Sequence, residues 1–134
     1  MISIIKYSKD KGVQYLKTEE LISWDYKSND KIWIDIYNCS LEENTHILKD
    51  IFNFHPLAIE DSLKYLGDHE VHHPKIDDFN DYLFIVFNGL TAIEKKFNYN
   101  LFSMSCFLGH NFLVTIHNEK NENTILKNTK SVLA

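Results

Sequence analysis

Runs of apolar residues predict several strands along this chain. Ile32–Tyr37 and Tyr82–Phe87 are apolar at almost every position, as expected of strands that are covered on both faces. In Asn100–Leu108 apolar and polar residues alternate, which predicts a half-buried strand. Phe112–His117 is expected to pair with it in a hairpin across residues 109–111. Tyr82–Phe87 is expected at the centre of the sheet, with helices on both of its faces.

The N-terminal segment predicts another hairpin. Ile2–Ser8 and Val13–Lys17 are rich in residues that favour strands, and they flank the loop Lys9–Gly12. Gly12 can adopt the positive φ that such a loop requires. A short helix, Glu19–Tyr26, is expected to follow and to end at the turn residues 28–30.

A capped helix is predicted from Ser40 to about Phe52. Ser40 and Glu43 have the S-x-x-E spacing in which both side chains accept hydrogen bonds from backbone N–H groups at the helix start. Asn53 is expected to end this helix. Its apolar residues are expected to face the core: Leu41, Ile47, Leu48, Ile51 and Phe52.

A second helix is predicted from Pro56 to Leu66. Proline suits the first helical position because it lacks the N–H that would go unpaired there. Gly67 can adopt the left-handed conformation that often ends a helix. The buried stripe of this helix is expected to consist of Ile59, Leu63 and Leu66.

Two adjacent carboxylates, Glu60 and Asp61, lie on the outer side of this second helix. At about 100° per residue, Asp61 falls nearly opposite the buried stripe, and Glu60 projects on the same outward half as Lys64. The helix is therefore expected to present two carboxylates to water or to a partner.

The elements together predict an α/β fold, a three-layer α/β/α domain with a mixed parallel and antiparallel central sheet. The chain has 134 residues and is 44% hydrophobic, which suits one domain spanning residues 1–134. Residues 123–134 have the spacing of an amphipathic helix that stops at Ala134 without a capping residue. We therefore expect a longer protein to have been cut at this point.

Charge and cysteine content narrow the functional classes. The chain has 14 lysines, no arginine and 19 acidic residues, for a formal net charge of −5, so nucleic acid is not an expected partner. Cys39 and Cys106 lack C-x-x-C spacing, which favours a reducing, cytosolic compartment. The longest apolar run, Tyr82–Phe87, is too short to span a bilayer, and the N-terminus has no signal-peptide pattern.

Glu60 and Asp61 are the main candidates for cation binding. Hard cations such as Mg²⁺ accept carboxylate oxygens and keep several waters, so one or two carboxylates can form a weak site. Acidic residues near a helix start also complement the helix dipole without binding any metal. The residue pattern alone leaves both interpretations open.

Other polar clusters carry weaker signals. His69, His72 and His73 could suggest zinc, but no fourth ligand is recognisable, and a solvated loop is the simpler interpretation. His55 is expected to cap or pack rather than bind metal. The acidic residues before the central strand do not match a calcium loop and are expected at a solvated strand entry: Asp77, Asp78 and Asp81. No nucleophile elbow or phosphate-binding glycine motif is present, so an enzyme is not expected.

Four segments in order resemble the cytoplasmic N-terminal domain of CorA-type divalent-cation transporters. They are Trp33-Ile34-Asp35, H-P-L-A-I-E-D at residues 55–61, P-K-I-D-D-F-N-D-Y-L-F-I-V-F at 74–87, and F-L-G-H-N-F-L-V-T-I-H at 107–117. The resemblance covers most of the chain. The loop at 68–73 differs from the shorter passage usual in this family.

The resemblance implies a role in feedback regulation. It places Asp61 in a regulatory cation site between subunits, with Glu60 close by and a partner carboxylate on a neighbouring subunit's long helix, beyond Ala134. It implies a homopentamer in which cytosolic Mg²⁺ holds the closed state, transport of Mg²⁺ or Co²⁺, and a position at the cytoplasmic face of the membrane. The stalk, the pore and the G-M-N signature of the family would lie outside these 134 residues.

Two alternatives remain open from the sequence. The chain could be a standalone soluble α/β binding module in which Asp61 serves only its helix. It could also be a metal-dependent hydrolase that uses the histidine loop, in which case it should retain stoichiometric zinc after purification.

Overall fold

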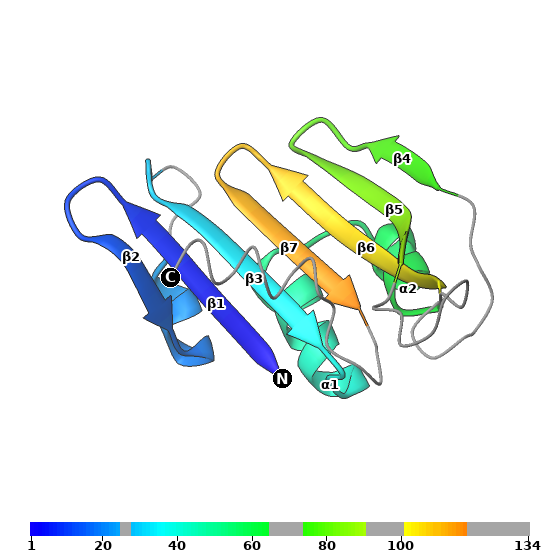
Figure 1. The fold of residues 1–134 in the computed structure, drawn as a ribbon, viewed down its shortest axis with the longest axis horizontal. Helices are drawn as coiled ribbons and strands as arrows, with labels where there is room; N and C mark the ends of the chain where they lie inside the picture. The colour runs from blue at the N-terminus through cyan, green and yellow to red at the C-terminus, as the bar shows by residue number, and fades with distance from the viewer. Residues whose placement is uncertain (25–27, 65–73, 91–100, 118–134) are drawn as a thin grey trace, which may run out of the picture.

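The computed structural model describes residues 1–24, 28–64, 74–90 and 101–117, which contain a seven-stranded mixed sheet. The strands lie in the order β2-β1-β3-β7-β6-β5-β4 (Figure 1). Their bounds are β1 Ile2–Ser8, β2 Gly12–Leu16, β3 Lys31–Tyr37, β4 Lys75–Asp78, β5 Tyr82–Leu90, β6 Leu101–Gly109 and β7 Phe112–His117. β3 and β7 pair in parallel, and the other neighbours in the sheet pair antiparallel. The predicted α/β class and mixed sheet are confirmed.

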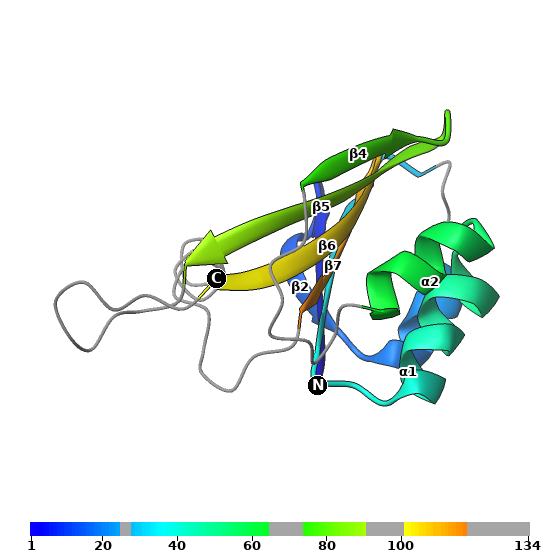
Figure 2. The same ribbon diagram turned by 90° about the vertical axis from the view of Figure 1, so that its right-hand side faces the viewer.

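The described helices all lie on one face of this sheet (Figure 2). They are the 3₁₀ helix η1 (Thr18–Ser23), α1 (Leu41–Thr45), the π-helical turn η2 (His46–Ile51) and α2 (Pro56–Lys64). The segment predicted as a short helix over Glu19–Tyr26 is thus a tighter 3₁₀ helix within the described part. The predicted tail helix lies outside the described residues.

Both predicted hairpins are confirmed. Gly12 has a φ of +69° at the turn between β1 and β2, which only glycine adopts at little cost. Gly109 ends β6, and a Cβ at this position would overlap the ring of Phe112. That ring is buried in the core, so the β6–β7 turn has no room for a larger residue.

The predicted helix after Ser40 forms as α1 followed by η2. Ser40 Oγ accepts a hydrogen bond from the Glu43 backbone N–H at 3.2 Å, as the capping motif predicts. The Glu43 carboxylate accepts from the Ser40 hydroxyl at 3.2 Å, where the motif predicted the Ser40 backbone N–H. Asn53, with a φ of +54°, ends the helical segment. Leu41 was expected in the core but is 69% exposed, whereas the polar Asn44 of the same turn is 2% exposed.

Two strand predictions were wrong. Tyr82–Phe87 was expected at the centre of the sheet, but β5 lies next to the edge strand β4, and β7 occupies the middle position. Asp77 and Asp78 were expected at a solvated strand entry, but they belong to a strand of their own, β4. An apolar run predicts a strand, but it does not specify which strands flank it.

The helix-facing side of the sheet carries an aromatic core around Phe54, which follows η2. The Phe54 ring stacks on Phe107 of β6, with centroids 4.1 Å apart and planes 7° apart. It also contacts Phe52, Tyr82 and Phe112 at centroid distances of 5.0, 4.7 and 5.7 Å. Since Phe54 lies two residues before the start of α2, this cluster fixes the second helix on the sheet.

The buried Cys106 thiol of β6 is expected to make stability fall at alkaline pH. Burial raises its pKa from 9.0 to about 11, because the thiolate is poorly solvated there. The neutral thiol contributes fully to the free energy of unfolding below the unfolded pKa of 9.0. As the pH rises toward 11, that free energy falls by roughly 2 kcal/mol. Urea unfolding measures this change. Between pH 8 and pH 10.5, the free energy of unfolding of the wild type should fall by about 2 kcal/mol more than that of Cys106→Ala.

The half-buried Cys39 provides the matched control for this measurement. Cys39→Ala should follow the wild-type pH dependence, because the Cys106 thiol is retained in that variant. Equal pH dependence in wild type and Cys106→Ala would contradict the expectation.

Candidate cation site

The helix α2 begins at a fixed position on the sheet. His55 Nδ1 accepts a hydrogen bond from the Leu57 backbone N–H at 3.1 Å, so His55 caps the helix as predicted. The backbone N–H of His55 in turn donates to the Tyr82 hydroxyl of β5 at 2.7 Å. The cap therefore ties the start of α2 to the sheet.

The buried side of α2 is centred on two small residues. Ala58 and Ser62 are only 2% and 1% exposed, and the Ser62 hydroxyl donates to the Ile59 carbonyl at 2.7 Å. Ile59 and Leu63, predicted as the centre of the stripe, are half-buried at its side. Small side chains let the helix approach the sheet closely, so the most buried positions differ from the most apolar ones.

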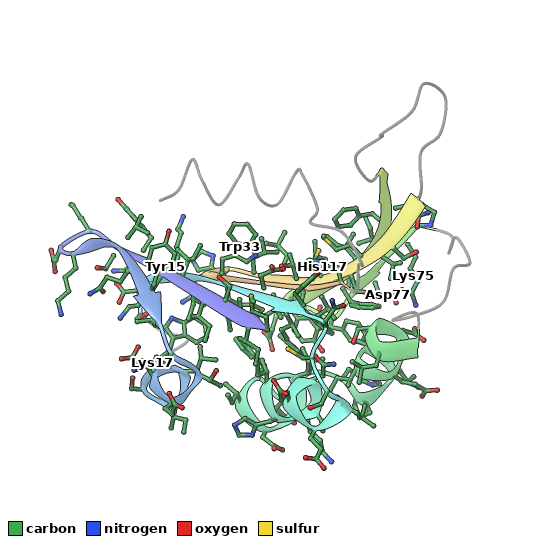
Figure 3. All side chains as sticks on the ribbon, turned by 60° about the horizontal axis from the view of Figure 1, so that its bottom comes forward. Tyr15, Lys17, Trp33, Lys75, Asp77 and His117 are labelled. Carbon is green, nitrogen blue, oxygen red and sulfur yellow. The ribbon has the colours of Figure 1, made fainter. Side chains whose placement is uncertain are left out.

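This rotation of the helix places Asp61 at the flank, toward β4, rather than opposite the buried side as predicted. Asp61 Oδ2 lies 2.7 Å from Lys75 Nζ. The same ammonium lies 3.1 Å from Asp77 Oδ2. Figure 3 shows Lys75 and Asp77 together beside α2. Asp61, Lys75 and Asp77 thus form one ionic cluster, with side chains 32%, 38% and 45% exposed.

Glu60 is exposed and does not share this direction. Neighbouring helical residues project about 100° apart, so Glu60 and Asp61 diverge from the helix axis. The carboxylate that the fold brings to Asp61 is Asp77, through Lys75. Asp77 was expected at a solvated strand entry, and no role was expected for Lys75.

The charge of Lys75 is stabilised by its partners. The hydrogen bond to Asp61 is the main cause that raises its pKa above 10.5, and the bond to Asp77 adds to it, while partial burial acts in the opposite direction. The ammonium also lies 5.5 Å from the centroid of the Phe84 ring, at a distance suited to a cation–π contact. Lys75 is therefore a positive charge at neutral pH.

The donor set at α2 suits a hard cation held weakly. Asp61 and Asp77 offer carboxylate oxygens, the ligand type that Mg²⁺ prefers. Within the described ranges, no group of three or more His, Cys, Asp or Glu side chains could hold a metal ion. Any ion bound here would therefore complete its coordination with water or with groups from another subunit.

The other acidic residues near β4 have structural roles or face water. Asp78 Oδ1 accepts a hydrogen bond from the Asn80 backbone N–H at 2.8 Å, and Asn80 has a φ of 71°. Asp78 thus shapes the turn into β5, and Asp81 is exposed. The histidine loop at 68–73 lies outside the described residues.

A second polar cluster lies on the sheet face away from the helices, between β3 and β7. Asp35 Oδ1 accepts a hydrogen bond from Thr115 Oγ1 at 2.7 Å and lies 2.8 Å from His117 Nε2. Trp33 Nε1 donates to Thr115 Oγ1 at 3.0 Å, and Figure 3 shows Trp33 on the side opposite the helices. Asp35 and His117 are 3% and 4% exposed, so this network is buried and joins the parallel strand pair.

Comparisons with known proteins place these features in a family context. A family model described as "CorA-like Mg2+ transporter protein" matches residues 28–132. A Bacillus subtilis (strain 168) protein named "Putative metal ion transporter YfjQ" is 34% identical over 87 residues, which are 63% of this chain and 24% of that protein. The chain thus spans about a quarter of this relative.

Solved structures share the fold. Full-length CmaX aligns with a TM-score of 0.71 at 10% identity, over 98% of this chain and 38% of CmaX. The soluble domain of CorA from Methanocaldococcus jannaschii aligns with a TM-score of 0.63 at 18% identity, over 99% of this chain and 46% of that chain. In the part of the chain that the structure describes, no helix is both long and apolar enough to cross a membrane.

Proposed function

The chain belongs to the CorA-like Mg²⁺ transporter protein family, and on that premise we propose that it is the cytosolic, Mg²⁺-sensing domain of a transporter of divalent metal ions. The observation that carries this proposal is the family match over residues 28–132, which includes α2 and β4. The relative named as a metal ion transporter supports the same class. The transported ion is Mg²⁺ or Co²⁺ in this proposal.

Asp61 is the proposed regulatory cation ligand. Its carboxylate lies at the flank of α2 and is one-third exposed, so an ion can reach it from solvent. Asp77 supplies a second carboxylate nearby, and Glu60 adds negative charge on the outer side of the helix. These groups match the oxygen ligands that Mg²⁺ selects.

The proposed assembly is a homopentamer at the cytoplasmic face of the membrane, with Asp61 near a neighbouring subunit. An ion between subunits neutralises facing carboxylates, and its loss lets like charges repel. The ion shifts the population toward the closed transporter only if it binds that state more tightly. Asp61 thus couples the cytosolic Mg²⁺ concentration to transport.

Asp61→Asn in the intact protein is expected to remove most of the inhibition by Mg²⁺. The amide keeps the size of the side chain but loses the charge that holds the ion. The Mg²⁺ concentration for half-maximal inhibition should rise at least about 10-fold, within the usual range of allosteric coupling. Uptake of Co²⁺ into proteoliposomes, with internal Mg²⁺ varied, measures this directly.

Asp78→Asn is the matched control, since it makes the same chemical change on the exposed side of β4. It should leave the half-inhibitory concentration at the wild-type value. Wild-type inhibition in Asp61→Asn would remove this residue from the mechanism, and an equal loss in Asp78→Asn would point to a general effect of charge.

A further inference from the structure

Lys75 is held at the junction of β4 and α2 by three contacts. As the first residue of β4, it shares the helix-facing side of the strand with Asp77, because side chains two apart point to the same face. Its ammonium lies 2.7 Å from Asp61, 3.1 Å from Asp77 and 5.5 Å from the centroid of the Phe84 ring. Lys75 is therefore placed between the two carboxylates nearest to the proposed cation site.

A cation that binds Asp61 must compete with this ammonium. Lys75 already occupies Asp61 Oδ2, and a metal ion on the same carboxylate would lie within a few ångströms of a like charge. Such repulsion between neighbouring charges is strong at short range. Lys75 and a metal ion therefore exclude one another at Asp61.

We propose that Lys75 is a built-in competitor for the cation at Asp61, so that a divalent ion binds by displacing the Lys75 ammonium and gains Asp77 as a second carboxylate. This inference rests on the proposed function and adds the means by which the same site sets its threshold concentration. Lys75 does not bind the ion; by competing for Asp61 it determines which ions bind there, so it is a specificity-determining residue.

Displacement is compatible with the exposure of the cluster. The Lys75 side chain is 38% exposed, and both carboxylates are also in contact with water. A lysine stem has four carbons and rotates freely, so the ammonium can move into solvent while the strand stays in place. Exchange then requires no rearrangement of β4 or α2.

Charge balance makes this exchange selective for divalent ions. With Lys75 in place, two carboxylates and one ammonium leave a net charge of −1. A monovalent ion that displaces Lys75 leaves the same net charge, so it gains nothing in charge and gives up the fixed hydrogen bonds. A divalent ion neutralises both carboxylates, so Lys75 rejects K⁺ while allowing Mg²⁺ to bind above a threshold.

The test compares Mg²⁺ inhibition of uptake by the intact protein in proteoliposomes, with MgCl₂ as the probe. Lys75→Met keeps an unbranched side chain one atom shorter and without the charge, and it should lower the half-inhibitory concentration about 3- to 10-fold. Lys75→Arg keeps the charge and should stay within about 2-fold of wild type or require more Mg²⁺. An unchanged or raised concentration in Lys75→Met would overturn the proposal.

A second pair of variants tests Asp77 as the ligand gained. In the Lys75→Met background the competitor is absent, so adding Asp77→Asn should raise the half-inhibitory concentration about 3-fold or more. No change on adding Asp77→Asn would overturn the part played by this carboxylate. Thermal unfolding of each variant identifies any that fail to fold, and Lys75→Gln then replaces Lys75→Met with the same expected shift.

Two further measurements separate this inference from the proposed function. KCl at matched ionic strength should not reproduce the effect of MgCl₂ in wild type, whereas equal effects would overturn the selectivity claim. If Asp61→Asn abolishes inhibition and Lys75→Met leaves it unshifted, only the competition fails. If Asp61→Asn retains wild-type inhibition, the proposed function fails and the competition with it.

Discussion

Asp35→Ala is expected to lower the free energy of unfolding by about 3–5 kcal/mol, a large share of the stability of a small domain. The carboxylate accepts from Thr115 and contacts His117 in a site where all three are nearly inaccessible to water. Removing it leaves a buried hydroxyl and a buried imidazole without their acceptor, and each such group is costly to bury. Urea unfolding at neutral pH measures the loss.

Asp35→Asn distinguishes the effect of the hydrogen-bond acceptor from the effect of the negative charge, because it keeps the first and removes the second. The amide retains one carbonyl oxygen of similar position, so a loss of about 1–2 kcal/mol is expected. Thr115→Val provides a second comparison, because it removes the hydroxyl that receives the Trp33 N–H. A loss below about 1 kcal/mol in Asp35→Ala would show that the network is replaceable by water.

Phe54→Ala is expected to destabilise the fold by about 3–5 kcal/mol, as usual for a buried phenylalanine. The ring is 3% exposed and stacks between Phe52 and Phe107. Its removal creates a cavity beside the cap of α2, so the helix that presents Asp61 loses support. Equilibrium urea unfolding gives the change in stability, and Mg²⁺ inhibition of uptake reports the effect on the site.

Phe54→Leu fills most of this space and should cost about half as much. Phe87→Ala, on the opposite face and 38% exposed, is the control for removing a phenylalanine that does not contact the cluster around Phe54. It should cost less than either variant at position 54. A cost in Phe54→Ala no greater than in Phe87→Ala would contradict the central role of this ring.

Features that depend on neighbouring residues could be predicted from the sequence. Ser40 caps the helix that follows it, Asn53 ends that segment, and Gly12 occupies a turn that requires positive φ. His55 caps α2, as its place before Pro56 indicated. In each case a short stretch of chain determines the local backbone, so distant residues do not alter the outcome.

The order of the strands required information that the sequence pattern does not hold. Tyr82–Phe87 is apolar throughout, yet Phe87 is 38% exposed and Ile85 is half-buried. Both lie on the face that the described helices leave open. An apolar residue on a sheet need not be buried. The prediction from this run therefore overestimated the burial of the strand and assigned it a position too near the centre of the sheet.

The candidate site could be predicted only in part. The family resemblance identified Asp61, but its partner Lys75 is 14 residues away and comes from a strand that was not recognised. Identifying 75–78 as a strand would have placed Lys75 and Asp77 on one face by simple alternation. The rotation of α2 that directs Asp61 toward this strand depends on the burial of the small residues Ala58 and Ser62. The pattern of apolar residues does not indicate that burial.

The parallel pairing of β3 with β7 determines when this domain can fold during its synthesis. Asp35 and Thr115 meet across 80 residues of chain, so β1, β2 and β3 leave the ribosome long before the strand that completes the sheet. Until then β3 has an open edge rich in isoleucine, and such edges invite pairing with other chains. The helix that presents Asp61 lies within the same interval, so the stacking of Phe54 on Phe107 that supports it forms only after β6 has been made.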